Sequence, residues 1–188
     1  SPEQLAALEL STPLILDLDG NGVQTTHLSE GVSFDLNATG ETIQTAWMAS
    51  GDALLAIDRN GNGSIDDGSE LFGSATQLAD GSLAEDGFAA LASLDSNVDG
   101  RISAADSEFA ALRAWLDGNS DGISQDGELV DLASLGIVSI DLSAQAGTEM
   151  NNGNWLGLIS SYTTEDGATH QIADVWLRTD DGLDATQT

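Results

Sequence analysis

Residues 95–128 read DSNVDGRISAADSEFAALRAWLDGNSDGISQDGE and hold two acidic loops of twelve residues on either side of a short apolar run. In each loop, carboxylate or amide side chains occupy positions 1, 3 and 5, glycine occupies position 6, and a carboxylate occupies position 12. This is the spacing of the EF-hand calcium loop, in which alternate residues direct oxygens inward, glycine permits a left-handed turn, and position 7 offers its backbone carbonyl. The expected ligands are Asp95, Asn97, Asp99, Arg101 and Asp106 in the first loop, and Asp117, Asn119, Asp121, Ile123 and Glu128 in the second.

The alternative interpretation is that these clusters are solvated turns, because Asp, Asn and Gly are common turn residues. Two loops in tandem, each with a terminal carboxylate and each beside an apolar helical run, favour calcium. The second loop departs from the pattern in one respect, since Ile123 falls at position 7 and Ser124 at position 8. This leaves open the usual strand contact between paired loops, but it does not change the ligand set.

Three further acidic loops precede this stretch. The loop that starts at Asp17 has Leu28 at position 12, so a carboxylate from elsewhere must complete it. The loop that starts at Asp35 has Thr39 where an acid is expected, so metal binding and a plain turn remain equally open. The loop at 58–70 has one inserted residue, which places its closing carboxylate at position 13. The expected ligands are Asp17, Asp19 and Asn21; Asp35 and Asn37; and Asp58, Asn60, Asn62, Ser64, Asp67 and Glu70, with Asp66 as a further candidate.

Hydrophobic periodicity predicts an α+β fold, with EF-hand-like calcium loops and short helices packed on small antiparallel β-sheets. Strands are expected at 13–18, 32–36, 43–48, 53–57, 137–142, 155–163 and 170–177, the last two joined by a hairpin at 165–167. Short helices are expected from residue 70 and at 88–94, 109–116 and 129–135. We expect residues 1–11 to form a linker or short helix from a preceding domain, residues 12–178 to form the calcium-binding module, and residues 179–188 to form a polar tail.

The chain carries a formal net charge of −28 and has only four basic residues, all of them arginine. So acidic a chain should repel nucleic acid and anionic membranes. Its acids recur at alternate positions beside apolar segments, which argues for neutralisation by about three to five Ca²⁺ ions. The absence of cysteine excludes disulfides and thiolate metal sites. Because no apolar run approaches the length of a membrane span and no signal peptide opens the chain, we expect no direct membrane insertion.

Signals for catalysis are weak. The segment 118–122 matches G-x-S-x-G, but it lies inside an acidic loop, whereas a nucleophile elbow needs a strand before it and a helix directly after it. His27 and His170 are isolated in the sequence, and calcium accounts for most carboxylates that could otherwise serve glycoside hydrolysis. We therefore predict that the module is not an enzyme.

The segments PLILDLDGNGVQTT, FDLN, TAW, LLAIDRNGNGSIDDGSELFG, GFAALASLDSNVDG and LRAWLDGNSDGISQDGEL follow one another in this order. Over residues 12–177 the series resembles the calcium-binding module of large bacterial RTX proteins. That family includes the self-processing module of FrpC-type toxins and ligand-binding modules of RTX adhesins. The resemblance implies type I secretion, calcium-triggered folding outside the cell, a location in the medium or at the bacterial surface, and flanking adhesin domains in the same chain.

Self-processing members of that family cleave an Asp-Pro bond at the start of the module, where the aspartate carboxylate attacks its own peptide carbonyl. The matching bond here is Thr12-Pro13, and threonine has no carboxylate, so this chemistry is unavailable. We therefore expect a non-catalytic adhesion module that recognises a peptide or another cell-surface ligand of a host or neighbouring cell. Two alternatives remain open: a self-processing module whose scissile aspartate is replaced by Thr12, and a calcium-rigidified structural linker.

An acidic ligand can approach so negative a surface only through a bound cation that keeps an open coordination position. The incomplete loops at Asp17 and Asp35 are the best candidates for such a position. Trp47 or Trp155 could add apolar contact to a ligand, although a place in the core is the commoner role of tryptophan.

Overall fold

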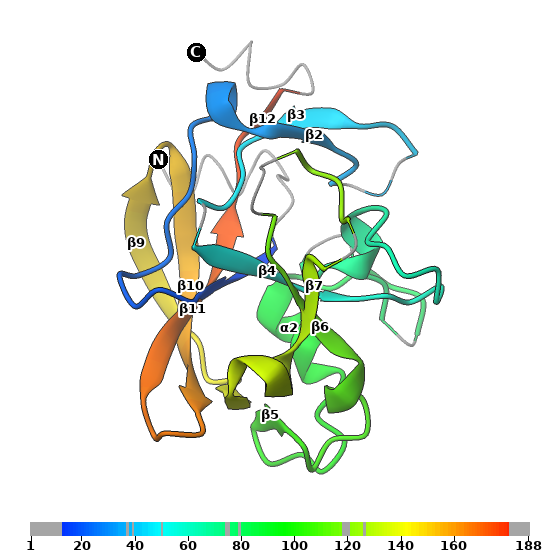
Figure 1. The fold of residues 1–188 in the computed structure, drawn as a ribbon, viewed down its shortest axis with the longest axis vertical. Coiled ribbons are helices and arrows are strands. Elements are labelled where there is room, and N and C mark those ends of the chain that lie inside the picture. Colours follow the sequence, from blue (N-terminus) through cyan, green and yellow to red (C-terminus); the bar gives the residue numbers. More distant parts are fainter. Residues whose placement is uncertain are drawn as a thin grey trace.

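In the computed structural model, the described residues are 13–36, 38, 40–49, 51–73, 76–78, 80–117, 121–125 and 127–180. Antiparallel strands dominate this part of the chain (Figure 1). Nine of the described strands form one sheet in the order β5-β8-β10-β11-β1-β4-β6-β7 with β9 paired to β10, and three form a second sheet in the order β12-β3-β2. The strands are β1 (Leu14–Asp17), β2 (Val32–Phe34), β3 (Ile43–Thr45), β4 (Asp52–Ile57), β5 (Arg101–Ser103), β6 (Leu112–Trp115), β7 (Leu129–Asp131), β8 (Ile137–Asp141), β9 (Gln145–Asn151), β10 (Asn154–Thr164), β11 (Thr169–Trp176) and β12 (Thr179–Asp180).

The large sheet is organised around β1 and β4, which pair with each other and are buried along their whole length. Both strands are apolar at consecutive positions, as expected for strands that are covered on both faces. Leu14 and Leu16 face one hydrophobic core, whereas Ile15 faces a second core on the opposite side of the sheet. Strand β4 divides its side chains between the two cores in the same way. This two-sided packing fixes the end of β1 beside the start of β4.

One α-helix lies in the described residues, α2 (Gly87–Ala92). Asp86 caps it by accepting a hydrogen bond from the Ala89 N–H at 2.8 Å, and Phe88 and Leu91 pack into the core. This helix confirms the one expected at 88–94. The other helical segments are short 3₁₀ turns: η1 (Leu28–Glu30), η2 (Gly68–Glu70), η3 (Phe109–Ala111) and η4 (Leu132–Leu135). Among the described helices, none is long and apolar enough to cross a membrane.

The expected α+β class is wrong, because the chain is mostly antiparallel β-sheet. The helix expected at 109–116 is η3 followed by β6, which pairs with β4 on one edge and β7 on the other. The helix expected at 129–135 is β7 followed by η4, and the one expected from residue 70 is η2, which ends there. Trp115 fits helical spacing with Leu112, yet in the sheet it lies opposite Leu54 and is fully buried. Strand pairing on two edges therefore overrides the local spacing.

The remaining strand expectations are confirmed to within a few residues, but β5, β9 and β12 were not expected. Strands β9 and β10 are joined by Asn152 and Gly153, whose φ angles of 51° and 89° are those of a tight hairpin turn. Strand β12 pairs with β3 and extends the sheet by two residues into the range expected to be a polar tail. The rest of that range and residues 1–12 lie outside the described residues.

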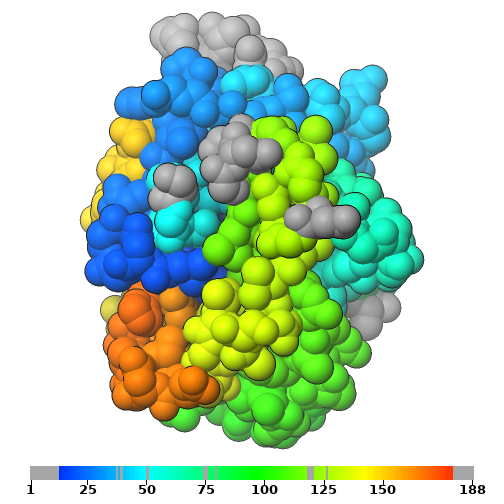
Figure 2. Space-filling view, in the orientation of Figure 1, coloured from blue at the N-terminus to red at the C-terminus, as the bar shows by residue number. Residues whose placement is uncertain are grey.

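The smaller sheet lies at one end of the molecule, and β5 lies toward the other (Figure 1). The turn of the β10–β11 hairpin packs against the end of η4, where the Glu165 N–H donates to the Gly136 carbonyl at 2.7 Å. Figure 2 shows this contact as orange atoms against yellow ones. The C-terminal hairpin is thereby attached to the central part of the chain.

Candidate metal centres

The five acidic loops share one backbone geometry. In each, the carboxylate at position 1 folds back and accepts a hydrogen bond from the N–H of the glycine five residues later, at 2.7–2.9 Å. The glycines have φ angles between 72° and 94°, a left-handed conformation that favours glycine. The pairs are Asp17 and Gly22, Asp35 and Gly40, Asp58 and Gly63, Asp95 and Gly100, and Asp117 and Gly122.

Carboxylates converge in three of these loops. Within the described residues, three groups bring one ligand oxygen from each member within 4.8 Å of the others: Asp17, Asp19 and Asp52; Asp95, Asp99 and Asp106; and Asp117, Asp121 and Glu128. The last two groups are positions 1, 5 and 12 of the tandem loops, so the loop spacing placed these side chains together. Each group could hold a cation.

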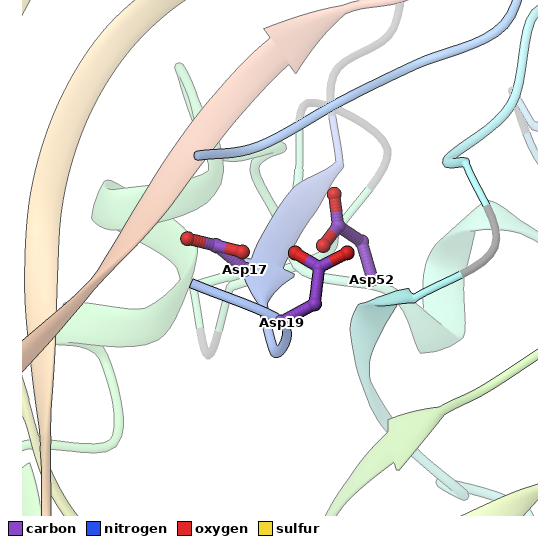
Figure 3. A group of neighbouring side chains, drawn as sticks. All are labelled: Asp17, Asp19 and Asp52. Atoms are coloured by element: carbon purple, nitrogen blue, oxygen red, sulfur yellow. The ribbon is translucent and has the colours of Figure 1, made fainter. Parts of the chain in front are cut away.

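The first group lies where β1 and β4 pair (Figure 3). Asp17 ends β1 and lies opposite Asp52, which begins β4, while Asp19 follows β1 in the loop. Asp17 and Asp52 are only 2% and 3% exposed, whereas Asp19 is exposed. Gly51 leaves room for this arrangement, because a Cβ atom there would lie 2.6 Å from Asp19 Oδ2. The pairing of β1 with β4 thus brings Asp17 and Asp52 together, and the loop that follows β1 adds Asp19.

The Asp52 carboxylate shows that this group fits a hard divalent cation. Its Oδ2 accepts a hydrogen bond from the Gln24 N–H at 2.8 Å, but its Oδ1 is buried and has no hydrogen-bond partner. Burial, and then the charges of Asp19 and Asp17, raise the pKa of Asp52 to about 7. An unpaired buried carboxylate oxygen is costly, and a cation of calcium size, which binds six to eight oxygens, would supply its missing partner.

Asp52 was missed in the sequence because it lies in no acidic loop. The sequence did require a carboxylate from elsewhere to complete the loop at Asp17, and the antiparallel pairing of β1 with β4 supplies one. Only strand register could have identified it. Asn21, the other expected ligand, is exposed, and its N–H lies 3.4 Å from Asp19 Oδ1.

We predict that the metal-free fold becomes more stable as pH falls through about 7. The folded chain binds a proton at Asp52, whose pKa is raised to about 7, whereas the unfolded chain releases that proton at its ordinary pKa of 3.8. Destabilisation by Asp52 is therefore complete above pH 7 and disappears as the pH approaches 4. Titrating metal-free chain with the osmolyte TMAO, which favours compact states, at several pH values would measure this. The same pH dependence in Asp52→Asn would contradict the assignment.

The second group closes the first tandem loop through Asp106, which is 3% exposed. Its two oxygens accept hydrogen bonds from the Ser96 and Ser103 N–H groups, each at 2.9 Å. Asn97 and Asp99 are exposed, and the Asn97 amide donates to Asp99 at 3.3 Å. Arg101, whose carbonyl was expected at position 7, begins β5 and pairs with β8.

The third group closes the second tandem loop and reaches into the core. Asp117 is 4% exposed, and burial raises its pKa although the N–H groups of Gly122, Asp121 and Trp47 oppose the shift. Glu128 accepts from the Gln125 N–H at 3.0 Å and the Trp115 indole at 3.3 Å. The side chain of Ile123 is exposed, and the expected ligand Asn119 lies outside the described residues.

The loop at 58–70 is closed by Glu70 despite its inserted residue. Glu70 is 3% exposed, burial raises its pKa, and it accepts from the Arg59 and Asp66 N–H groups at 2.8 Å. The Asp67 carboxylate caps η2 by accepting a hydrogen bond from the Ser69 N–H at 2.9 Å. Within this loop the side-chain amides of Asn60 and Asn62 donate to Asp66, and the Ser64 backbone N–H donates to Asn62 Oδ1.

Three loops touch one another on one side of the molecule. The Gly68 N–H donates to the Asp35 carbonyl, and the Ile65 N–H donates to Ser124 Oγ, both at 2.8 Å. The third loop is thus hydrogen-bonded to the second and the fifth, whereas β5 of the first tandem loop pairs with β8. Asp35 is 7% exposed, and its expected partner Asn37 lies outside the described residues.

Neither histidine belongs to a described carboxylate group. His27 is exposed beside η1, and His170 stacks on Tyr162 with ring centroids 5.3 Å apart. The serine of the G-x-S-x-G match lies outside the described residues. Trp47 is fully buried, and Trp155 is half-buried against Trp176 at a centroid distance of 4.7 Å. The expected core role of tryptophan is thus confirmed for Trp47.

Residues 14–178 match the family model described as the SPM domain. The chain belongs to the SPM domain family. Over 182 residues this SPM domain is 47% identical to the iron-regulated protein FrpA of Neisseria meningitidis serogroup C. That alignment covers 95% of the chain but only 16% of the length of FrpA. The expected relation to Frp-type proteins is therefore confirmed, and the matched span includes all five acidic loops.

Proposed function

We propose that this SPM domain is a calcium-folded, non-catalytic binding module of a large secreted bacterial protein, acting in the medium or at the cell surface. One observation carries the proposal. The β1–β4 pairing buries Asp17 and Asp52 beside Asp19 and leaves one Asp52 oxygen without a hydrogen-bond partner. Folding therefore brings together charges that repel, and a divalent cation reverses the sign of that interaction.

Calcium suits these sites better than the other common metals. The three carboxylate groups contain only oxygen donors, which excludes the sulfur- and imidazole-rich sets preferred by zinc and copper. Magnesium demands near-ideal octahedral geometry, whereas calcium tolerates the irregular mixture of carboxylates, amides and carbonyls that these loops offer. Millimolar extracellular calcium would fill even weak sites, whereas the low calcium of a resting cytosol would leave them empty and delay folding until after export.

The Asp17 site is the one best placed to bind a ligand. A shallow hollow of about 400 Å³ opens beside Asp17 and is lined by Gly20, Ser161, Thr169 and His170, among others. Apart from Asp17, none of its lining residues is acidic. Calcium held by Asp17, Asp19 and Asp52 would border this hollow through Asp17, the member of the group that lines it. A carboxylate of a peptide ligand could then complete the ion's coordination while hydroxyl groups donate hydrogen bonds to it.

The proposal is tested with short peptides that end in a free carboxylate, each compared with its amidated form. Because chelation would also unfold the domain, the decisive comparison uses Asp19→Asn at saturating calcium, with Glu149→Gln on β9 as a matched exposed control. We expect calorimetry to show binding of the acid peptides to the native chain and the control, and a loss of at least about tenfold for the amides and for Asp19→Asn. Binding that is equal in Asp19→Asn, or no binding by any peptide, would contradict the ligand-binding role.

A further inference from the structure

Two tryptophans donate hydrogen bonds from the hydrophobic core to the carboxylates at the two ends of the Asp117–Glu128 loop. The Trp47 indole N–H donates to Asp117 Oδ2 at 2.8 Å, and the Trp115 indole N–H donates to Glu128 Oε1 at 3.3 Å. Both tryptophans are 0% exposed. Positions 1 and 12 of this loop are therefore each held from beneath by a rigid aromatic side chain.

The two indoles belong to one aromatic cluster, defined by Phe34, Trp47 and Trp115. The ring centroids of Trp47 and Trp115 lie 5.4 Å apart in an edge-to-face arrangement, and Phe34 lies 5.3 and 5.5 Å from them. The cluster draws on separate parts of the fold, since Phe34 ends β2, Trp47 follows β3 and Trp115 ends β6. Its rings are thus fixed by strand pairing rather than by the loop that they support.

The Asp95–Asp106 loop provides a contrast within the same chain. Its closing Asp106 is held by the N–H groups of Ser96 and Ser103, which belong to the loop itself. That loop must therefore organise its own carboxylate, whereas the Asp117–Glu128 loop receives two donors from the core. An indole N–H is a neutral donor that can hold a carboxylate in its metal-binding orientation. The carboxylate side chain then loses less conformational entropy when the ion binds.

We infer that Trp47 and Trp115 are positioning residues that pre-orient Asp117 and Glu128 for calcium, so that the core sets the affinity of this one loop. The inference rests on the proposed calcium binding. The competing explanation is that the carboxylates merely satisfy two buried indole N–H groups, which need partners wherever they are buried. The two explanations differ in what happens to calcium at this loop when an indole is removed.

The glycines at position 6 provide a probe of each loop separately. The N–H groups of Gly122 and Gly100 donate to the first carboxylates of their own loops, so their NMR signals report calcium at the second and the first tandem loop. Because the metal-free chain is expected to be largely unfolded, calcium is titrated into ¹⁵N-labelled chain kept compact with TMAO, and the ratio of the Gly122 midpoint to the Gly100 midpoint is measured. A variant that only destabilises the fold moves both midpoints together, whereas a local loss changes their ratio.

For Trp47→Phe we expect the ratio to rise about tenfold, the size typical of losing a partner that orients a ligand. A smaller rise is expected for Trp115→Phe, whose hydrogen bond is longer. Phe34→Leu is the packing control, because it disturbs the same cluster without removing a hydrogen bond, and its ratio should stay unchanged. An unchanged ratio in Trp47→Phe would overturn the inference, as would an equal rise in Phe34→Leu. If the Gly122 and Gly100 signals of the native chain did not change when calcium was added, that result would instead refute the proposed function.

Discussion

In excess chelator, this SPM domain is expected to lose most of its β-sheet structure and to regain it when calcium is restored. The chain has a formal charge of −28, and the fold buries several carboxylates, among them Asp17, Asp52 and Asp117. A site held at about 1,000 times its Kd adds about 4 kcal/mol to stability. Several such sites match or exceed the usual stability of a domain, about 5–15 kcal/mol.

Far-UV circular dichroism in EDTA, and then in excess calcium, measures this effect. Sodium chloride at equal ionic strength is the control, because it screens exposed charges without entering the loops. We expect calcium to restore the β-sheet spectrum and sodium chloride to leave the chain largely unfolded. Identical spectra in EDTA and in calcium would show that the fold stands without metal.

Replacing Asp52 by asparagine is expected to have opposite effects with and without calcium. In saturating calcium, the variant loses one of three converging carboxylates, and we expect the affinity of the Asp17 site to fall by on the order of 100-fold. Without metal, the variant removes a buried charge whose pKa is raised to about 7. Removing this charge should therefore stabilise the metal-free fold above pH 7. Solvent reaches the Asp19 side of the site and screens the Asp52 charge, so we expect a gain in folding stability of about 2–4 kcal/mol.

The effects of Asp52→Asn with and without calcium need different measurements. Calorimetric calcium titration gives the loss of affinity, and the TMAO concentration that folds half of the metal-free chain gives the gain in stability. Glu149→Gln removes the same charge from an exposed position of β9 and should change neither quantity appreciably. If Asp52→Asn destabilised the chain in both conditions, its carboxylate would be an ordinary structural group rather than a ligand.

The acidic loops were readable in the sequence because loop chemistry is local. The spacing of Asp, Asn and Gly fixes which carboxylate meets which backbone N–H within a dozen residues, and all five loops have the same hydrogen bond from glycine to aspartate. For the same reason, the sequence correctly grouped Asp95 and Asp117 with the closing carboxylates of their own loops, which lie beside them in the structure. Insertion of one residue in the loop at 58–70 did not prevent Glu70 from reaching its N–H partners.

Elements whose structure depends on residues far away in the sequence could not be predicted in this way. The segment 109–116 has helical spacing, but part of it forms β6, which pairs with β4 on one side and β7 on the other. No local signal in the segment indicates that these two strands lie beside it. Asp52 joins Asp17 only through strand register, and Trp47 reaches Asp117 across 70 positions of sequence. One missed strand did carry a local signal: Asn152-Gly153 is a strong hairpin pair, and it would have predicted β9 beside β10.

Native mass spectrometry tests most directly whether metal ions hold this chain together. The technique separates compact from extended ions and counts the calcium carried by each. We predict that compact ions carry about three to five Ca²⁺ and that the metal-free chain appears only among extended ions. A compact population that carries no metal would contradict the account.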